Sequence, residues 1–275
     1  MSLEAALVAF AISIVGGAIG ALLGLGGGII VVPGLTLLLG IDVHTAIGAS
    51  LIAIIATSSG AAAAYVRERM TNIRLAMLLE LGTTLGAVAG AGLAGVLSGD
   101  VLQVVFGIIM ALTALQMLRE KSKSATLPPD RLADRLQLHG SYYDQVEQRE
   151  IAYRVTRTPI GLALMLVAGV LSGLLGIGAG ILKVPAMDLA LGLPFKVSSA
   201  TSNFMIGVTA AAGAGVWFAR GDINPHIAGP VAAGVLVGAV GGSRLLARLR
   251  GRTIRLFFVV VLLYTAVQML WRGLT

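Results

Sequence analysis

The two halves of this chain repeat each other in an ungapped register. Shifting the sequence by 152 residues places 24–118 on 176–270, and 29 of the 95 aligned pairs are identical. The identical pairs include glycines and prolines, namely Gly26 and Gly178, Gly28 and Gly180, and Pro33 and Pro185. Shared apolar composition raises chance identity, but glycines and prolines matched in one register indicate a duplication. We therefore expect two structurally equivalent halves.

Each half consists of apolar runs separated by short polar gaps. The runs lie at about 3–24, 28–41, 45–66, 75–97 and 101–118, and at about 159–175, 180–193, 197–218, 226–243 and 254–271. With 57% hydrophobic and only 12% charged residues, the chain cannot cover itself with a hydrated surface. Roughly 20 apolar residues cross the hydrocarbon as a helix. The sequence predicts an all-α integral membrane protein with about 8–10 membrane segments, and excludes a soluble enzyme, a disulfide scaffold and a disordered chain.

The positions of the charges and the absence of cysteine argue against nucleic-acid-binding proteins and against thiol-dependent or Cys-metal enzymes. The net charge is +7, but 14 of the 33 charged residues lie between Arg119 and Arg157, and most others lie in the gaps. This is the loop bias of membrane proteins, so we expect no nucleic-acid binding. Without cysteine there is no thiolate nucleophile and no Cys-based metal site. Because no catalytic triad, carboxylate pair or His-x-x-x-His spacing occurs, we expect no enzyme activity, no catalytic residues, no metal and no cofactor.

The arginines predict that the two halves are inverted relative to each other. Arg67, Arg69 and Arg74 share one gap of the first half, whereas the corresponding gap of the second half has only Arg220. Five arginines instead crowd 244–255, whose counterpart carries only Asp100. With 119–158 inside, the positive-inside rule places corresponding loops on opposite faces. Each half then crosses an odd number of times, as five spans or as three spans plus a hairpin.

The expected organisation has three parts. Residues 1–118 are the first transmembrane repeat, 119–158 are a cytoplasmic linker or small appendage, and 159–275 are the second repeat. Within the linker, 131–138 are compatible with a short amphipathic helix, and Ile151, Tyr153 and Val155 alternate as in a strand. A partly ordered connector is the alternative. We expect a multi-pass protein of the inner (plasma) membrane.

Two short runs predict helices that are broken or re-entrant at glycine-rich motifs. The runs 28–41 and 180–193 have only 14 residues each, contain a proline, and follow glycine clusters at 24–28 and 176–180. Helix breaks near the midplane would leave free N–H groups and partial positive charge, which suit an anion. Inversion would bring both breaks to one central site. The predicted substrate-binding residues of the breaks are Gly26, Gly27, Gly28, Gly178, Ala179 and Gly180.

Close helix packing is the alternative interpretation of the glycines. Gly16, Gly20, Gly24 and Gly28 form one row with four-residue spacing, and Gly82, Gly86 and Gly90 form another. Such rows allow helix backbones to approach closely. We interpret both rows mainly as packing faces, and assign substrate contacts to the additional glycines of the breaks.

Several polar residues near the breaks are candidates for the same site. Ser50 and Ser202 recur in one register, and Asn203 follows the second, so we predict all three as substrate contacts. Lys183 is predicted as the counter-ion of an anion, because ionisable residues within membrane segments are functional candidates. Asp188 and Glu80 are the proton-coupling candidates. A structural ion pair between Lys183 and Asp188, and a carboxylate of Glu80 that snorkels to the helix end, remain alternatives.

Two motifs give the chain a resemblance to a known family. They are Gly24-Leu-Gly-Gly-Gly-Ile-Ile-Val-Val-Pro33 and Gly176-Ile-Gly-Ala-Gly-Ile-Leu-Lys-Val-Pro185, supported by Ala200-Thr-Ser-Asn-Phe-Met205 and by the tracts 140–144 and 153–155. The chain resembles the sulfite exporter TauE/SafE family, also called the toluene sulfonate uptake permease group. Ala179 departs from the pattern, since the first motif has Gly27 there. The resemblance implies a proton-coupled permease for small sulfur-containing anions such as sulfite or organosulfonates, often acting as an exporter.

Together these features predict a secondary transporter with alternating access around a midplane site. Its expected partners are a small anion, protons and the lipid bilayer; a homodimer is compatible with the sequence, which does not determine the oligomeric state. The alternatives are a passive anion channel and an integral membrane protein of non-transport function, such as a scaffold acting through 119–158.

Overall fold

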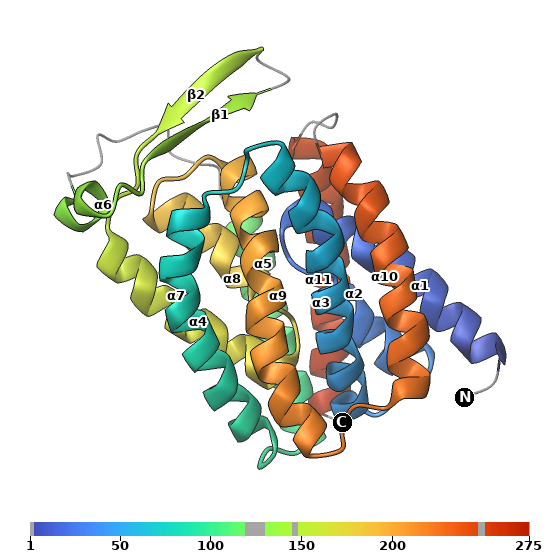
Figure 1. Cartoon of the computed structure of the whole chain (residues 1–275). Coiled ribbons are helices and arrows are strands. Elements are labelled where there is room, and N and C mark those ends of the chain that lie inside the picture. Colours follow the sequence, from blue (N-terminus) through green and yellow to red (C-terminus); the bar gives the residue numbers. More distant parts are fainter. Residues whose placement is uncertain (1–2, 119–129, 145–147, 247–250, 275) are drawn as a thin grey trace.

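The computed structural model describes residues 3–118, 130–144, 148–246 and 251–274 (Figure 1). The first half forms α1 (Leu3–Leu23), α2 (Gly28–Pro33), the π-helical η1 (Gly34–Leu38), α3 (Val43–Arg67), α4 (Ile73–Ala94) and α5 (Gly99–Leu118). The second half repeats this order with α7 (Thr158–Leu175), α8 (Gly180–Pro185), η2 (Ala186–Ala190), α9 (Phe195–Ala219), α10 (Pro225–Leu246) and α11 (Gly251–Leu274). Between the halves lie α6 (Arg131–Arg135) and the strands β1 (Gly140–Asp144) and β2 (Arg149–Tyr153).

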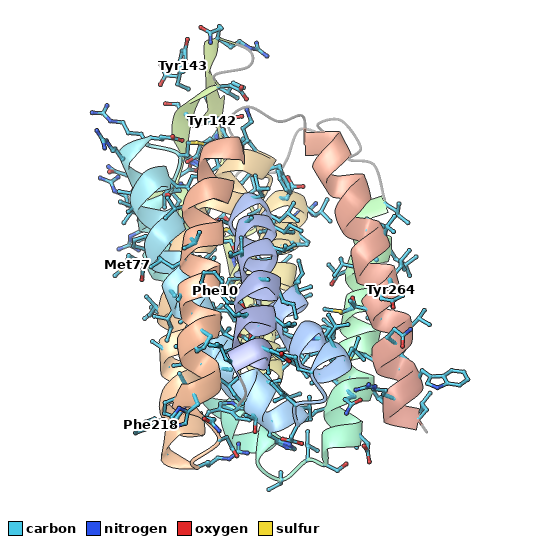
Figure 2. All side chains as sticks on the ribbon, turned by 90° about the vertical axis from the view of Figure 1, so that its right-hand side faces the viewer. Phe10, Met77, Tyr142, Tyr143, Phe218 and Tyr264 are labelled. Atoms are coloured by element: carbon cyan, nitrogen blue, oxygen red, sulfur yellow. The ribbon has the colours of Figure 1, made fainter. Side chains whose placement is uncertain are left out.

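The surface of the helix bundle is apolar along its length. Among the described residues, six helices are long and apolar enough to cross a membrane: α1, α3, α4, α7, α9 and α10. Large apolar side chains such as Met77, Phe218 and Tyr264 are 63%, 73% and 65% exposed and project from the outside of the bundle (Figure 2). A hydrocarbon solvent makes so much exposed apolar surface favourable. The prediction of an all-α integral membrane protein is confirmed.

The two halves are inverted repeats. The turn between α3 and α4 lies at the end of the bundle that carries the strands, whereas the equivalent turn between α9 and α10 lies at the opposite end (Figure 1). The halves also interlock, because α1 packs on α10 while its counterpart α7 packs on α4. Helices α3 and α9 pack against each other, as do α5 and α11. Every major contact is thus either paired with its counterpart or made between two equivalent helices, as a pseudo-two-fold arrangement requires.

Glycine rows allow the interlocked helices to touch backbone to backbone. A Cβ atom at Gly90 of α4 would lie 1.9 Å from the carbonyl oxygen of Val170 on α7. In the other half, a Cβ atom at Gly238 of α10 would lie 2.0 Å from the carbonyl oxygen of Ile14 on α1. The packing interpretation of Gly82, Gly86 and Gly90 is confirmed, since all three face the backbone of α7.

Each half begins with a hairpin that has one long and one short arm. Gly16 of α1 lies beside Val31 of α2, and Gly34 of η1 lies beside Ile12, so the short arm folds back along the long one. Residues 28–38 are helical over only about 16 Å, too short for a hydrocarbon layer of about 30 Å. Pro33 lacks an N–H group, and the helix continues past it as the π-helical η1. This arrangement corresponds to three spans plus a hairpin rather than to five full spans.

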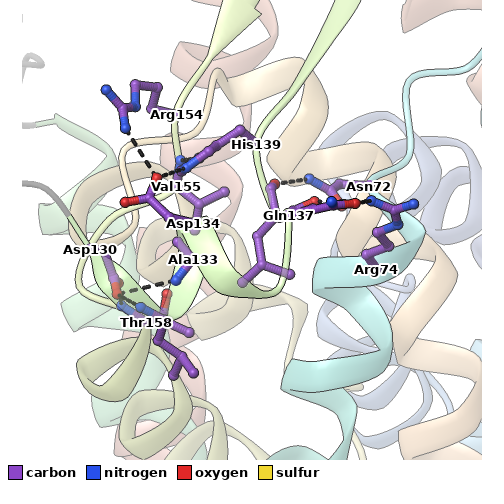
Figure 3. Close-up of polar contacts among 12 residues, drawn as sticks. Asn72, Arg74, Asp130, Ala133, Asp134, Gln137, His139, Arg154, Val155 and Thr158 are labelled. Atoms are coloured by element: carbon purple, nitrogen blue, oxygen red, sulfur yellow. Dashed lines mark hydrogen bonds and ion pairs between the residues drawn. The ribbon is translucent and has the colours of Figure 1, made fainter.

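The short segment between the halves covers one end of the bundle. Strands β1 and β2 form an antiparallel pair, and α6 precedes them. Asp130 caps α6 and also accepts a hydrogen bond from the backbone N–H of Thr158, the first residue of α7 (Figure 3). Asn72, just before α4, donates to Leu138 O at 2.8 Å, and Lys196 of α9 lies 2.9 Å from Asp144 Oδ1. The segment therefore contacts the first residues of three membrane helices.

Candidate functional site

The glycine clusters interrupt two helices where the backbone must enter the left-handed region. Gly26 and Gly27 have φ of +79° and +76°, and the equivalent Gly178 and Ala179 have φ of +74° and +57°. Glycine adopts these angles without the steric penalty of a Cβ atom. Ala179 adopts them with a side chain, so the departure from the glycine pattern does not prevent the second break. The predicted breaks are present in both halves.

The two breaks meet inside the bundle. A Cβ atom at Gly180 would lie 2.2 Å from the carbonyl oxygen of Gly24, and one at Gly28 would lie 2.7 Å from that of Gly176. Gly26 and Gly178 both lie against the side chain of Ile54 on α3. The two contacts are related by the pseudo-two-fold relation, since Gly24 is equivalent to Gly176 and Gly28 to Gly180, and the two predicted breaks lie in one region.

The predicted serines bind the backbone of the opposite break. Ser202 Oγ donates to Gly24 O at 2.6 Å, and the equivalent Ser50 Oγ donates to Gly176 O at 2.7 Å. Asn203 Nδ2 donates to Ala21 O at 2.9 Å. Carbonyl groups at the C-terminal end of a helix lack partners within that helix, and these side chains supply them. In this structure the three side chains are bonded to backbone carbonyls of the opposite half or of α1, and their contact with a substrate stays a prediction.

A charged cluster lies one helical turn beyond the second break. Lys183 on α8 is fully buried, and its Nζ lies 3.3 Å from Glu80 Oε2 on α4 and 2.5 Å from Thr209 Oγ1 on α9. The Thr209 hydroxyl in turn donates to Glu80 Oε1 at 2.5 Å. Glu80 therefore does not reach the helix end, and its side chain is only 12% exposed. Asp188 lies in η2, five residues beyond Lys183, and is partly buried.

Sequence reasoning identified two members of this cluster singly but not their pairing. Lys183 and Glu80 are 103 residues apart, and no local pattern joins them. Thr209 was not among the predicted site residues. The one available signal was that Thr57 and Thr209 are identical in the repeat, whereas most of their neighbours differ.

The chemistry of this region consists of hydroxyl and amide donors, backbone N–H groups, one ammonium and one carboxylate. Within the described residues there is no group of three or more His, Asp or Glu side chains that could hold a metal ion. Donors around a single cation suit a small anion, whose charge the ammonium and the hydrogen bonds can share.

Comparisons with known proteins agree with this architecture. The family model described as "Sulfite exporter TauE/SafE" matches residues 9–269. The chain is 30% identical over 271 residues to "Probable membrane transporter protein YunE" of Bacillus subtilis (strain 168), covering 96% of both chains. It is 28% identical over 274 residues to "Probable membrane transporter protein" of Xylella fastidiosa (strain 9a5c), covering 97% of this chain and 92% of the relative. No solved structure matches the chain.

Proposed function

This chain belongs to the sulfite exporter TauE/SafE family, and we propose that it is a secondary transporter of small sulfur-containing anions such as sulfite or organosulfonates. The family and its named relatives already make it a membrane transporter. We propose in addition that transport is proton-coupled and proceeds by alternating access. We also propose that the protein lies in the inner membrane with 119–158 on the cytoplasmic side.

The observation that carries the proposal is the meeting of two helix breaks between inverted halves. Gly24 and Gly180 belong to opposite halves, and their backbones are in direct contact. In transporters with inverted repeats, discontinuous helices at the repeat interface form the substrate site, and rocking of the halves exposes it to either side. The same geometry here supports a site between 24–28 and 176–180.

We assign the binding roles as follows. Backbone N–H groups of Gly26, Gly27, Gly28, Gly178, Ala179 and Gly180 would hold the oxygen atoms of the anion. When the halves move apart, Ser50, Ser202 and Asn203 would exchange their carbonyl partners for the anion. Lys183 would supply the opposing charge, and Glu80 or Asp188 would carry the proton.

A passive anion channel is the alternative that the experiment must distinguish from a transporter. A reconstituted preparation separates the two. Uptake of sulfite, sulfate, sulfoacetate and chloride into liposomes would be measured together with the transport current, with and without a pH gradient. We expect a saturable signal for a sulfur oxyanion that changes with the gradient. A current without saturation or countertransport would indicate a channel.

Substitutions at the breaks test the site itself. Gly27→Leu and Ala179→Leu together should abolish the signal, because both positions have positive φ and a Cβ atom at position 27 would lie 3.0 Å from Gly16 O, so the larger side chains must change the shape of the breaks. Gly92→Leu is the matched control, since Gly92 lies on α4 with nothing within 4 Å of an added Cβ atom. All variants should elute as folded protein in size-exclusion chromatography. If Gly27→Leu fails to fold, Ala179→Leu alone replaces it, because position 179 already accommodates a Cβ atom. Unchanged transport by folded variants would remove the anion site from the breaks.

A further inference from the structure

The cluster of Lys183, Glu80 and Thr209 is electrically neutral, and this constrains what can join it. A charge within a membrane protein is stable only beside a partner, and removal of one partner leaves the other uncompensated. The ammonium of Lys183 already contacts both Glu80 and Thr209. An anion that binds Lys183 while Glu80 remains ionised would therefore bury a net negative charge.

Lys183 lies within reach of the two breaks. It follows Gly180 by three residues, which is about 4.5 Å along a helix, and Gly180 packs directly on the backbone of Gly24 and Leu25. The flexible four-carbon stem of lysine lets its ammonium move between neighbouring partners. The same ammonium can thus serve Glu80 in one state and an anion between the breaks in another.

The cluster occurs in only one half. The positions equivalent to Lys183, Glu80 and Thr209 are Val31, Ala232 and Thr57. Val31 is fully buried, and the Thr57 hydroxyl donates to Ala53 O within its own helix at 2.9 Å. The fold therefore packs this position without any charge. A buried ion pair that packing does not need is a candidate for function rather than for stability.

We propose that Glu80 is the proton-coupling residue, and that a proton on Glu80 allows the substrate anion to replace Glu80 as the partner of Lys183. This inference rests on the proposed function and specifies its coupling. The anion and one proton enter from the same side: the anion binds the ammonium of Lys183 and the proton binds Glu80. On the other side both leave and the ion pair re-forms. One monovalent anion and one proton move together per cycle, with no net charge.

Few other titratable groups face Glu80. Helix α7, which packs on α4, has none between Thr158 and Leu175. Helix α9 has only Lys196, which pairs with Asp144 at the end of the bundle. On α4 itself, Arg74 lies at the helix start and bonds to Gln137. The remaining candidate is Asp188 on η2, which follows α8, and the experiment must separate it from Glu80.

Two assays on liposomes distinguish coupling from transport. Methanesulfonate and sulfite serve as probes; methanesulfonate keeps one negative charge across neutral pH, so any pH effect reports the protein. Exchange of labelled for unlabelled probe measures binding and movement of the loaded transporter. Acidification of the lumen, driven by an inward methanesulfonate gradient, measures proton cotransport.

Glu80→Gln imitates the protonated residue and should split the two assays. Exchange should stay within about threefold of wild type, whereas net uptake and lumenal acidification should fall at least about tenfold, because the empty transporter cannot return with Lys183 unpaired. Lumenal acidification equal to wild type in Glu80→Gln, or loss of acidification in Asp188→Asn alone, would overturn this inference. Neither result would contradict the proposed transport function. Absence of exchange in folded wild type for both probes would overturn the proposed function, and this inference with it.

Thr209→Ala provides a test that keeps both charges, and Thr57→Ala is its matched control in the other half. The Thr209 hydroxyl stabilises the ionised pair, so its loss should raise the pH of half-maximal net uptake by about one unit. Thr57→Ala should leave this pH unchanged, since Thr57 bonds only within its own helix. Equal midpoints in both variants and wild type would contradict the assignment even if Glu80→Gln does not fold.

Discussion

Tyr65 and Trp217 occupy equivalent positions of the two halves and make the same contact. Tyr65 Oη donates to Ala21 O at 3.0 Å, and Trp217 Nε1 donates to Gly173 O at 3.0 Å. The two acceptors are themselves equivalent, 152 residues apart, near the C-terminal ends of α1 and α7. The duplication thus preserved a hydrogen bond although the chemical group that donates it changed from a phenol to an indole.

Tyr65→Phe should lower the free energy of unfolding by about 0.5–1.5 kcal/mol, because it removes one of the two side-chain donors to Ala21 O and leaves Asn203 Nδ2 as the other. Tyr65 is only 1% exposed. Tyr143→Phe is the control, since Tyr143 is 53% exposed on β1 and should change stability by less than about 0.5 kcal/mol. Unfolding in mixed detergent micelles measures both. Equal stabilities would mean that the hydrogen bond from Asn203 Nδ2 satisfies Ala21 O by itself.

Gly90→Ala should destabilise the protein by about 2–3 kcal/mol through overpacking. The added methyl group would meet the backbone carbonyl of Val170 at 1.9 Å, so α4 and α7 would have to separate. Gly92→Ala, two residues along the same helix, meets nothing within 4 Å and should be neutral or slightly stabilising. The unfolding midpoints of the two variants provide the comparison, and a Gly90→Ala midpoint at or above that of Gly92→Ala would refute the backbone contact.

Ser202→Ala should cost about 1–3 kcal/mol of stability, because Gly24 O loses a buried donor. Ser198→Ala, one turn earlier on α9, should change stability little, since Ser198 Oγ is buried and has no hydrogen-bond partner among the described residues. The same preparations report the KM for transport. A raised KM in Ser202→Ala alone would support the additional role in substrate binding.

Acid should loosen the segment that covers the end of the bundle. Burial raises the pKa of Asp130, but hydrogen bonds from the backbone N–H groups of Thr158, Ala133 and Leu132 outweigh it and hold this pKa below its ordinary value of 3.8. A carboxylate with a lowered pKa stabilises the folded state above that ordinary value, and the stabilisation is lost as pH falls through the folded pKa. Docking should therefore be constant near neutrality and weaken below about pH 4.

Hydrogen exchange of β1 and β2 between pH 3 and 7, corrected for the intrinsic exchange rate, measures this loosening. Asp130→Asn keeps a residue that caps helices well but removes the titration, so its protection should depend less on pH. The pKa of Asp134 is also lowered, first by the hydrogen bond to His139, and its contribution has the same sign. Asp130→Asn with an unchanged pH profile would assign the effect to Asp134 instead.

Much of the architecture could be predicted, because the duplication, the glycine motifs and the uneven distribution of arginines can each be identified in the sequence without knowing the fold. The paired motifs at 24–33 and 176–185 predicted the breaks, and the arginines around Arg67 and Arg244 predicted the inversion. In the linker, Ile151 and Tyr153 were correctly placed in a strand, while Val155 lies beyond its end, buried against the bundle.

Partners across the fold were not predictable in the same way. That Ser50 and Ser202 bond to the opposite break depends on how two inverted halves interlock, and no single half contains that information. The pairing of Lys183 with Glu80 likewise joins α8 to α4 of the other half. Hydroxyl and charged side chains find partners over long sequence distances, whereas helix breaks are set by the residues at the break.

The interlocking of the halves has a consequence for biosynthesis. The backbone of Phe10 and Ile14 rests on Gly234 and Gly238, which are made some 224 residues later. At ribosomal rates of about 5–20 residues per second, α1 waits about 10–45 s for its partner. During that time α1 must either lie in the lipid without its partner helix or stay bound to the insertion machinery. The chain therefore acquires its final helix contacts only when its last quarter has entered the membrane, so a ribosome that stalls earlier leaves a protein with no folded half.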